Sequence, residues 1–116
     1  MEQVLVMNQR EILLVPFPFS DQSGRKVRPV IVVSNDSFNN RSEDVIVVGV
    51  TSNIAKDKYS LGLSNNDLEE GRLFTKCSIK AENILRLEKG LVIKKIGKIN
   101  KIKFNEIIAL IDKIIK

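Results

Sequence analysis

Short runs of branched hydrophobic residues, separated by polar turns, make up most of the first ninety residues of the sequence. Their length and their valine and isoleucine content are typical of β-strands, and some of them alternate between apolar and polar positions. The polar run at 35–42 carries cap and turn residues at nearly every position and can form at most a short helical turn. The pattern predicts strands at residues 11–19, 27–34, 44–52, 58–64 and 73–87, with a short strand or turn at 90–96.

The end of the chain changes from strand-like runs to helical spacing. Apolar residues recur three and four positions apart, which predicts an amphipathic helix over Lys101–Ile115 with its apolar stripe packed on the sheet. Asn100 stands in front of this helix as its N-cap. The stripe comprises Ile102, Ile107 or Ile108, Ile111, and Ile114 or Ile115. Five to seven short strands followed by one helix indicate a mainly β protein that forms a small, strongly curved barrel.

Length, charge and cysteine content narrow the class of protein. A chain of 116 residues fits a single domain spanning 1–116. The single cysteine, the lack of a signal-like N-terminus and the lack of a long apolar stretch favour the cytoplasm and no membrane association. A net charge of +5 favours polyanionic partners, although it also lies in the range that keeps small domains soluble. The lysine-rich stretch 89–103 is interpreted first as a solvated face and second as a phosphate-tracking surface.

The pair Arg28-Pro29 follows a polar loop that contains Arg25 and Lys26 and precedes a buried strand. A guanidinium stays charged and offers a planar fork that matches two phosphate oxygens, so Arg28 is a candidate phosphate ligand. The plain alternative is a surface arginine paired with a carboxylate. Thr51 and Ser52 end an apolar strand, where a hydroxyl can bind a phosphate oxygen, but a Thr-Ser-Asn sequence after a strand is also ordinary turn chemistry.

Lys80 and Glu82 lie two residues apart on one predicted strand and should therefore project from the same face. The plain alternative is a solvated ion pair worth under about 1 kcal/mol. Because the sequence has no histidine, any acid–base chemistry must use Arg, Lys, Asp, Glu and hydroxyl groups. We expect Cys77 to be a small core residue, and we expect no metal and no other cofactor.

Three sequence blocks carry a resemblance to a known family. Residues 11–21, 28–34 and 48–52 resemble, in order and spacing, the PemK/MazF family of toxins from bacterial toxin–antitoxin modules. With the segment 78–87 and the terminal helix, the likeness covers nearly the whole chain. It implies a small SH3-like barrel of the CcdB/PemK type with a C-terminal amphipathic helix, and it implies a homodimer. It also implies a metal-independent endoribonuclease that cleaves single-stranded RNA (mRNA) and is neutralised by a cognate antitoxin.

The resemblance also implies roles for individual residues. Arg28 and Thr51 match the family's catalytic arginine and its catalytic threonine or serine. Lys80 and Glu82 stand where some members carry Arg and Asp, which are assigned to acid and base work. On this interpretation Arg28 stabilises the transition state, Thr51 positions phosphate and Glu82 is the base. The expected RNA-binding residues are Arg25, Lys26, Ser52 and Lys80.

Two other functions stay open at this point. One is a non-enzymatic binding module with a protein target such as gyrase, since relatives with this type of barrel include a gyrase-poisoning toxin. The other is an inactive homologue that only binds an antitoxin. The combination of Arg-Pro and Thr-Ser separates these hypotheses, because a protein-binding mode does not require it. The chain also departs from the family at Arg10-Glu11, where Gly-Asp or Gly-Glu is usual.

Overall fold

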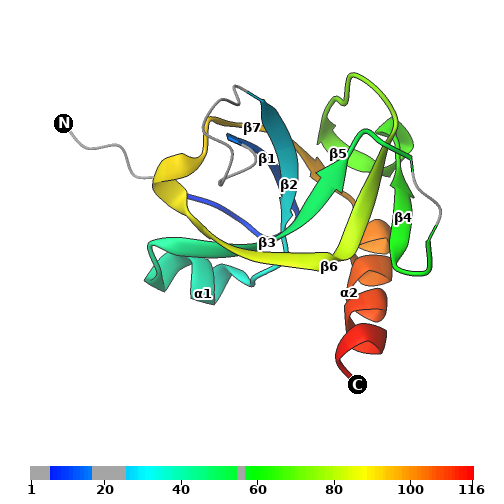
Figure 1. The fold of residues 1–116 in the computed structure, drawn as a ribbon. Helices are drawn as coiled ribbons and strands as arrows, with labels where there is room; N and C mark the ends of the chain where they lie inside the picture. Colours follow the sequence, from blue (N-terminus) through cyan, green and yellow to red (C-terminus); the bar gives the residue numbers. More distant parts are fainter. Residues whose placement is uncertain (1–5, 17–25, 55–56) are drawn as a thin grey trace.

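Seven antiparallel strands form one curled sheet in the structure, a computed structural model that describes residues 6–16, 26–54 and 57–116 (Figure 1). The strand order is β4-β6-β3-β2-β1-β7-β5. The strands are β1 (Glu11–Pro16), β2 (Val27–Val32), β3 (Asp44–Thr51), β4 (Ser60–Leu63), β5 (Leu68–Gly71), β6 (Cys77–Glu88) and β7 (Lys94–Ile99). The helical elements are α1 (Asp36–Arg41), the 3₁₀ turns η1 (Asn65–Asp67) and η2 (Lys89–Leu91), and α2 (Lys101–Ile115). The predicted mainly β, strongly curved architecture with a C-terminal helix is confirmed.

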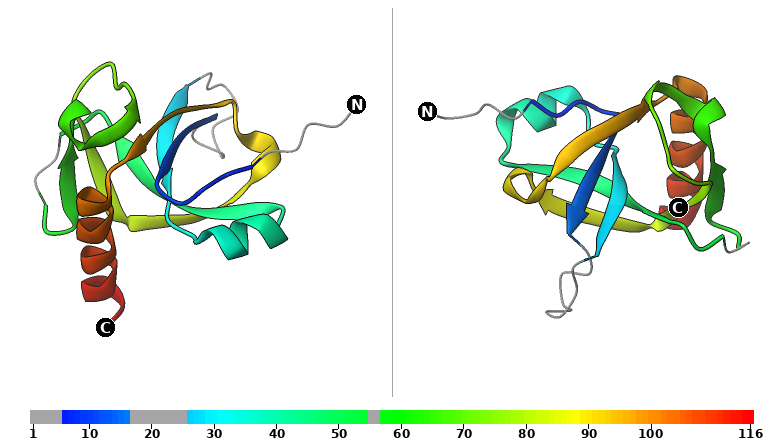
Figure 2. Two further views of the ribbon diagram at one scale, coloured as in Figure 1. Left: turned by 180° about the vertical axis from the view of Figure 1, so that it is seen from behind. Right: turned by 90° about the horizontal axis from the view of Figure 1, so that it is seen from above.

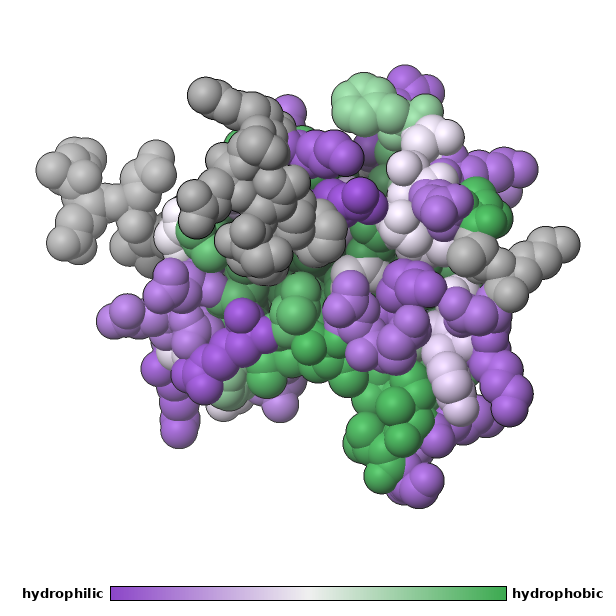
Figure 3. Space-filling view, viewed as in Figure 1, coloured by the Kyte–Doolittle hydropathy of each residue, from purple (hydrophilic) through white to green (hydrophobic). Residues whose placement is uncertain are grey.

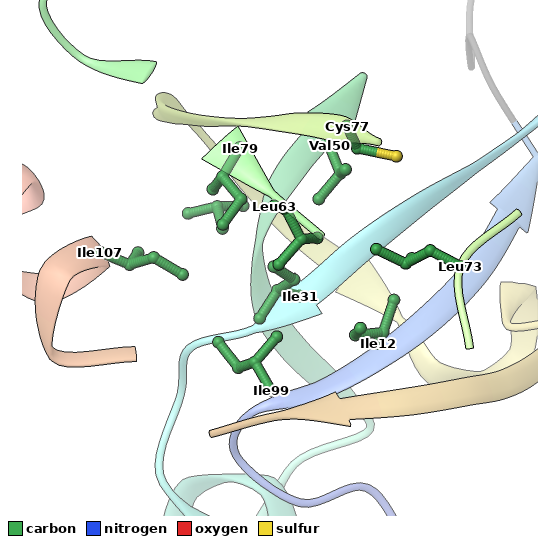
Figure 4. Packing of buried hydrophobic residues seen from close by; sticks show 10 residues of the cluster. Ile12, Ile31, Val50, Leu63, Leu73, Cys77, Ile79, Ile99 and Ile107 are labelled. Atoms are coloured by element: carbon green, nitrogen blue, oxygen red, sulfur yellow. The ribbon is translucent and has the colours of Figure 1, made fainter. Parts of the chain in front are cut away.

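The sheet buries residues on both faces, so its central strands carry continuous rather than alternating hydrophobic runs. Successive residues of β1 show this: Ile12 belongs to one buried cluster and Leu13 to the other. In β2, Ile31 joins the first cluster, whereas Val30 and Val32 join the second. Figure 4 shows the first cluster, to which α2 contributes Ile107. The curl of the sheet therefore encloses one core, while the second core fills its other face.

The helix α2 has the predicted bounds and the predicted cap, because Asn100 Oδ1 accepts from Lys103 N at 2.8 Å. Ile107 is buried, and Phe104 and Ile111 pack against the same cluster. The expectation for Ile102 is wrong: its side chain is 75% exposed, because at 3.6 residues per turn it lies about 140° around the helix from Ile107. Neither α2 nor any other helix in the described ranges is long and apolar enough to cross a membrane.

Some strand bounds differ from prediction. The strand predicted at 73–87 begins only at Cys77, and the predicted helical turn after β2 is a six-residue helix, α1. The sequence pattern does not predict the strand β5 (Leu68–Gly71), because Leu68 is followed by the turn-forming sequence Glu69-Glu70-Gly71. Gly71 has a φ of 84°, and a Cβ there would overlap the carbonyl of Ile96 on β7.

The remaining strands lie within their predicted ranges, except for β7, which begins four residues later than predicted and runs to Ile99 instead of ending at 96. The structure has β2 at Val27–Val32, β3 at Asp44–Thr51, β4 at Ser60–Leu63 and β7 at Lys94–Ile99. The first strand ends at Pro16, and the predicted continuation over 17–19 lies outside the described residues. Figure 2 shows the same sheet from behind and from above, with α2 against one end of it.

Candidate functional site

Arg28 lies at the beginning of β2 and Thr51 at the end of β3, and their side chains meet. Arg28 Nη1 donates to Thr51 Oγ1 at 3.3 Å. The two strands are antiparallel and in register from the pair Val30–Gly49 onward, and the same register continued by two residues sets Arg28 opposite Thr51. Pro29 has no N–H to donate to a neighbouring strand, so it suits the point where this ladder begins. The two predicted residues are therefore brought together by strand pairing.

The hydroxyl of Thr51 is oriented by two donors. Its oxygen accepts from Arg28 Nη1 and from the backbone N–H of Asn53, the latter at 3.1 Å. A hydroxyl has two lone pairs and one proton, so with both lone pairs engaged the O–H remains as a donor. The pair thus presents a permanent cation and an O–H group side by side, which is the donor arrangement that a phosphate needs.

Lys80 on β6 completes this small pocket. It pairs with Gly49 of β3, so its side chain rises on the same face of the sheet as Arg28 and Thr51. Lys80 Nζ lies 3.4 Å from Glu82 Oε2, so the structure places this predicted pair together. Among the described residues, the pocket is lined by Val15, Arg28, Pro29, Val30, Gly49, Val50, Thr51, Lys80, Asn83 and Leu85. Glu82 is not in this lining and reaches the pocket through Lys80.

A second carboxylate, that of Asp57, holds Lys80 more closely. Asp57 Oδ2 lies 3.0 Å from Lys80 Nζ, and Asp57 Oδ1 accepts from Ser60 Oγ at 2.9 Å and from Tyr59 N at 3.0 Å. The hydrogen bond from Lys80, followed by those from Ser60 and Tyr59, lowers the pKa of Asp57. The hydrogen bond to Asp57 raises the pKa of Lys80. Partial burial opposes this shift, and the nearby carboxylate of Glu82 adds to it. Lys80 is therefore a fixed cation at neutral pH rather than a proton donor.

The strand β6 bulges beside the pocket. Its pairing with β3 jumps from Val48–Ile84 to Gly49–Lys80, so residues 81–83 have no partners in the ladder. The bulge brings the Asn83 amide over Gly49, where a Cβ would lie 2.8 Å from Asn83 Nδ2. The glycine therefore leaves the space in which Asn83 enters the pocket.

A larger groove of about 500 Å³ meets the pocket at Arg28 and Pro29. We call it the site groove; its polar and aromatic lining residues include Lys26, Arg28, Ser52 and Phe74. The predicted residues Lys26 and Ser52 thus lie beside Arg28, whereas Arg25 lies outside the described residues. Cys77 forms part of the groove wall but is buried, and burial raises the pKa of its thiol. It is a core residue, as expected (Figure 4).

Sequence reasoning missed Asp57 and Asn83. Asp57 begins an Asp-Lys-Tyr-Ser segment whose turn chemistry is visible in the sequence, but its partner Lys80 is 23 residues away and is reached only through the pairing of β4 with β6. Asn83 follows Glu82 directly, yet regular alternation would turn it to the opposite face. The bulge in β6 turns the Asn83 side chain toward the pocket, and no pattern in the sequence predicts that bulge.

The chain is similar to a known protein family and to solved structures. The family model of PemK-like, MazF-like toxins of type II toxin–antitoxin systems matches residues 8–115. No curated protein sequence matches the chain significantly. Three solved structures share the fold. An endoribonuclease in complex with its cognate antitoxin, from a mycobacterial species, is 18% identical over 92% of each chain, with a TM-score of 0.75.

The second is an endoribonuclease from a mycobacterial species, which is 17% identical over 97% of this chain and 93% of its own, with a TM-score of 0.76. The third is a MazE–MazF structure from Deinococcus radiodurans, with 15% identity, coverage of 95% and 96%, and a TM-score of 0.77. These likenesses establish the fold, and the family match confirms the resemblance seen in the three sequence blocks. The chain belongs to the PemK-like, MazF-like toxins of type II toxin–antitoxin systems.

Proposed function

We propose that this toxin is a metal-independent endoribonuclease that cleaves single-stranded mRNA in the cytoplasm and is neutralised by a cognate antitoxin. The observation that carries the proposal is the 3.3 Å contact between the Arg28 guanidinium and the Thr51 hydroxyl, in a pocket that also holds Lys80. These groups offer positive charge and an O–H donor to a phosphate. Proteins of the same fold are named endoribonucleases, and one of them is bound to its antitoxin.

The proposed reaction is attack of a ribose 2′-hydroxyl on its own phosphodiester. A bond forms between the 2′-oxygen and phosphorus, the bond from phosphorus to the 5′-oxygen breaks, and the products carry a 2′,3′-cyclic phosphate and a 5′-hydroxyl. The 2′-hydroxyl loses a proton and the departing 5′-oxygen gains one. Arg28 stabilises the charge that develops on the phosphate oxygens, and Thr51 donates its O–H to one of them. Glu82, which Lys80 holds at the pocket, accepts the 2′-hydroxyl proton, and the departing 5′-oxygen takes its proton from water.

The decisive experiment is cleavage of single-stranded RNA in EDTA by wild type and by Arg28→Ala. Removing one charge-stabilising donor of this kind lowers a rate by roughly 100- to 1,000-fold. Arg41→Ala is the matched control, because Arg41 is an exposed arginine in the last turn of α1, which follows the opposite end of β2. The control should cut like wild type, and the fragments should carry 5′-hydroxyl ends that polynucleotide kinase can phosphorylate.

Equal cutting by wild type and Arg28→Ala would remove Arg28 from the mechanism. A protein-directed toxin makes a different prediction. If host growth arrest persists when Arg28 and Thr51 are both replaced by alanine in a folded protein, the target is not reached through this pocket and the endoribonuclease proposal fails.

A homodimer is the proposed working form. Isoleucines on β6 and α2 are exposed, and Figure 3 shows hydrophobic surface that continues from β6 onto α2. Ile84 and Ile108 are both more than a third exposed. A second copy of the chain, seated on this surface, would cover these side chains and bring two cationic sites into one assembly.

A further inference from the structure

The segment between β5 and β6 holds an aromatic side chain entirely in solvent. Phe74 has a relative exposure of 102%, whereas the other exposed large hydrophobic residues of the described ranges reach at most 75%. Exposed hydrophobic residues are common singly, so exposure alone assigns no role. Two further features of Phe74 point to a role: its backbone is firmly anchored, and its side chain lines two grooves.

The backbone around Phe74 is anchored on both sides. Leu73 and Cys77 are both buried in the core cluster shown in Figure 4. The side chain of Asn65 also clamps Leu73: its Oδ1 accepts from Leu73 N at 2.7 Å, and its Nδ2 donates to Leu73 O at 3.4 Å. Because the backbone on both sides of Phe74 is held firmly, the exposed ring is pre-organised. Little backbone freedom remains to be lost when a ligand binds to it.

Phe74 stands between two grooves. On one side it lines the site groove, which contains Lys26, Arg28 and Ser52. On the other side it lines a groove of about 420 Å³ with Asn66 and Lys76, which we call the amide groove. In Figure 1 the beginning of β2, the end of β3 and the β5–β6 segment all lie in the upper part of the molecule. A chain-like ligand that leaves Arg28 along the site groove therefore meets the ring before it reaches the amide groove.

The lining of both grooves favours a nucleic acid strand. Among the described residues, neither groove is lined by an acidic side chain, and together they contain Lys26, Arg28 and Lys76. Lysine and arginine contact phosphates, an aromatic ring stacks on a base of any identity, and an exposed amide such as that of Asn66 can bond the edge of a base. A cation, a ring and an amide in this order match the repeating unit of a single strand.

We propose that Phe74 stacks on a nucleobase of single-stranded RNA next to the cleaved phosphate, and that the following nucleotide enters the amide groove. The inference rests on the proposed function and extends it, because it names a substrate-binding residue outside the Arg28 pocket. Phe74 contacts a base that does not react, so it contributes binding rather than chemistry. Its loss should raise KM while kcat is retained.

The first test measures stacking without cleavage. The chain has no tryptophan, so Phe74→Trp introduces a single fluorescent reporter at this position. Titration with a single-stranded RNA whose 2′-hydroxyls are methylated, and which is therefore not cleaved, should quench that fluorescence because the indole stacks on a base. Ile93→Trp is the control, because Ile93 is exposed and lines neither groove. The fluorescence of this control variant should not be quenched by the RNA.

The second test is kinetic. Phe74→Leu keeps an apolar side chain but removes the ring, and Phe74 contributes nothing to the buried core, so the variant should unfold like wild type in a thermal melt. Stacking energies correspond to a rise in KM of about 5- to 150-fold, with kcat unchanged. Arg28→Ala should show the opposite pattern, a loss of kcat.

The outcomes separate this inference from the proposed function. If wild type cleaves RNA but Phe74→Leu has an unchanged KM and Phe74→Trp is not quenched, the stacking proposal is overturned and the ring serves another partner, such as a protein. If wild type cleaves no RNA, the proposed function fails, and quenching by the methylated RNA still decides whether Phe74 binds a base.

Discussion

At the scale of single residues, Arg10 shows how a side chain can hold a strained backbone. Its φ is 80°, a region that favours glycine, and it is the one non-glycine residue with a positive φ in the described ranges. Arg10 Nη1 donates to Glu69 Oε2 and to Ile99 O, both at 2.9 Å. These bonds tie the turn before β1 to β5 and to the end of β7, and they offset the cost of the conformation.

This arrangement predicts an unusual order of stability for two substitutions. Arg10→Ala keeps the strained φ and loses both hydrogen bonds, so it should be less stable than wild type. Arg10→Gly loses the same bonds but relieves the strain, and should therefore be more stable than Arg10→Ala by about 1 kcal/mol. Urea unfolding of the three proteins measures the difference. An alanine variant at least as stable as the glycine variant would contradict this account of Arg10.

The carboxylate of Asp57 predicts a pH dependence with a definite sign. Its pKa is lowered in the folded protein, so its stabilising effect is present above the unfolded pKa of about 4 and is lost as the pH falls through the folded value. The pKa of Lys80 is raised, so its contribution is fully present below its unfolded pKa and is lost only as the pH rises through the folded value in the alkaline range. The contribution of the Asp57–Lys80 pair to the free energy of unfolding should therefore be constant through neutral pH.

Asp57→Asn tests this sign. At pH 7 the variant should unfold at a lower urea concentration than wild type, and the gap should narrow at pH 3. Asp112→Asn is the matched control, since Asp112 pairs with Lys116 on an exposed helix end, and it should differ little from wild type at either pH. A gap for Asp57→Asn that is as wide at pH 3 as at pH 7 would show that its carboxylate charge is not the cause.

At the scale of elements, α2 gives a direct measure of which apolar positions hold the sheet. Ile107 is fully buried and Ile102 is 75% exposed, although both belong to the predicted stripe. Ile107→Ala should lower the free energy of unfolding by about 2 to 5 kcal/mol, while Ile102→Ala should change it by less than about 0.5 kcal/mol. Chemical denaturation followed by circular dichroism compares them. Similar losses for both variants would mean that α2 packs differently.

The elements also show what can be predicted from the sequence. The bounds of α2 follow from local signals, namely the cap at Asn100 and the helical spacing, and the strands β2 and β3 follow from their buried hydrophobic runs. The strand β5 cannot be predicted from its local sequence, because it forms through backbone pairing with β7, some thirty residues later. In the site, the Arg28–Thr51 contact follows from simple antiparallel register. The position of Asn83 depends on a bulge that no residue pattern marks.

At the scale of the whole molecule, the proposed catalytic site and the exposed isoleucines of β6 and α2 differ in chemical character. The site presents cations and hydroxyls. Ile84 of β6 and Ile108 of α2 are exposed, and Figure 3 shows hydrophobic surface that continues from β6 onto α2. A stable interface between two proteins buries about 800 Å² per partner and is apolar at its centre. The isoleucine surface is apolar, so we expect the chain to be a dimer that pairs through it.

The prediction is that Ile84→Asp combined with Ile108→Asp converts a dimer into a monomer, because each copy would have to bury two carboxylates without partners. Ile93→Asp, which adds a carboxylate at an exposed isoleucine in the segment between η2 and β7, should leave the dimer intact. Sedimentation velocity at micromolar concentration measures the mass of each protein. A wild type that sediments as a monomer, or a double variant that stays dimeric, would exclude this surface as the interface.

If the dimer joins two cationic sites, the monomeric variant should also bind uncleavable single-stranded RNA more weakly and with a smaller dependence on salt, because fewer lysines and arginines would contact the strand.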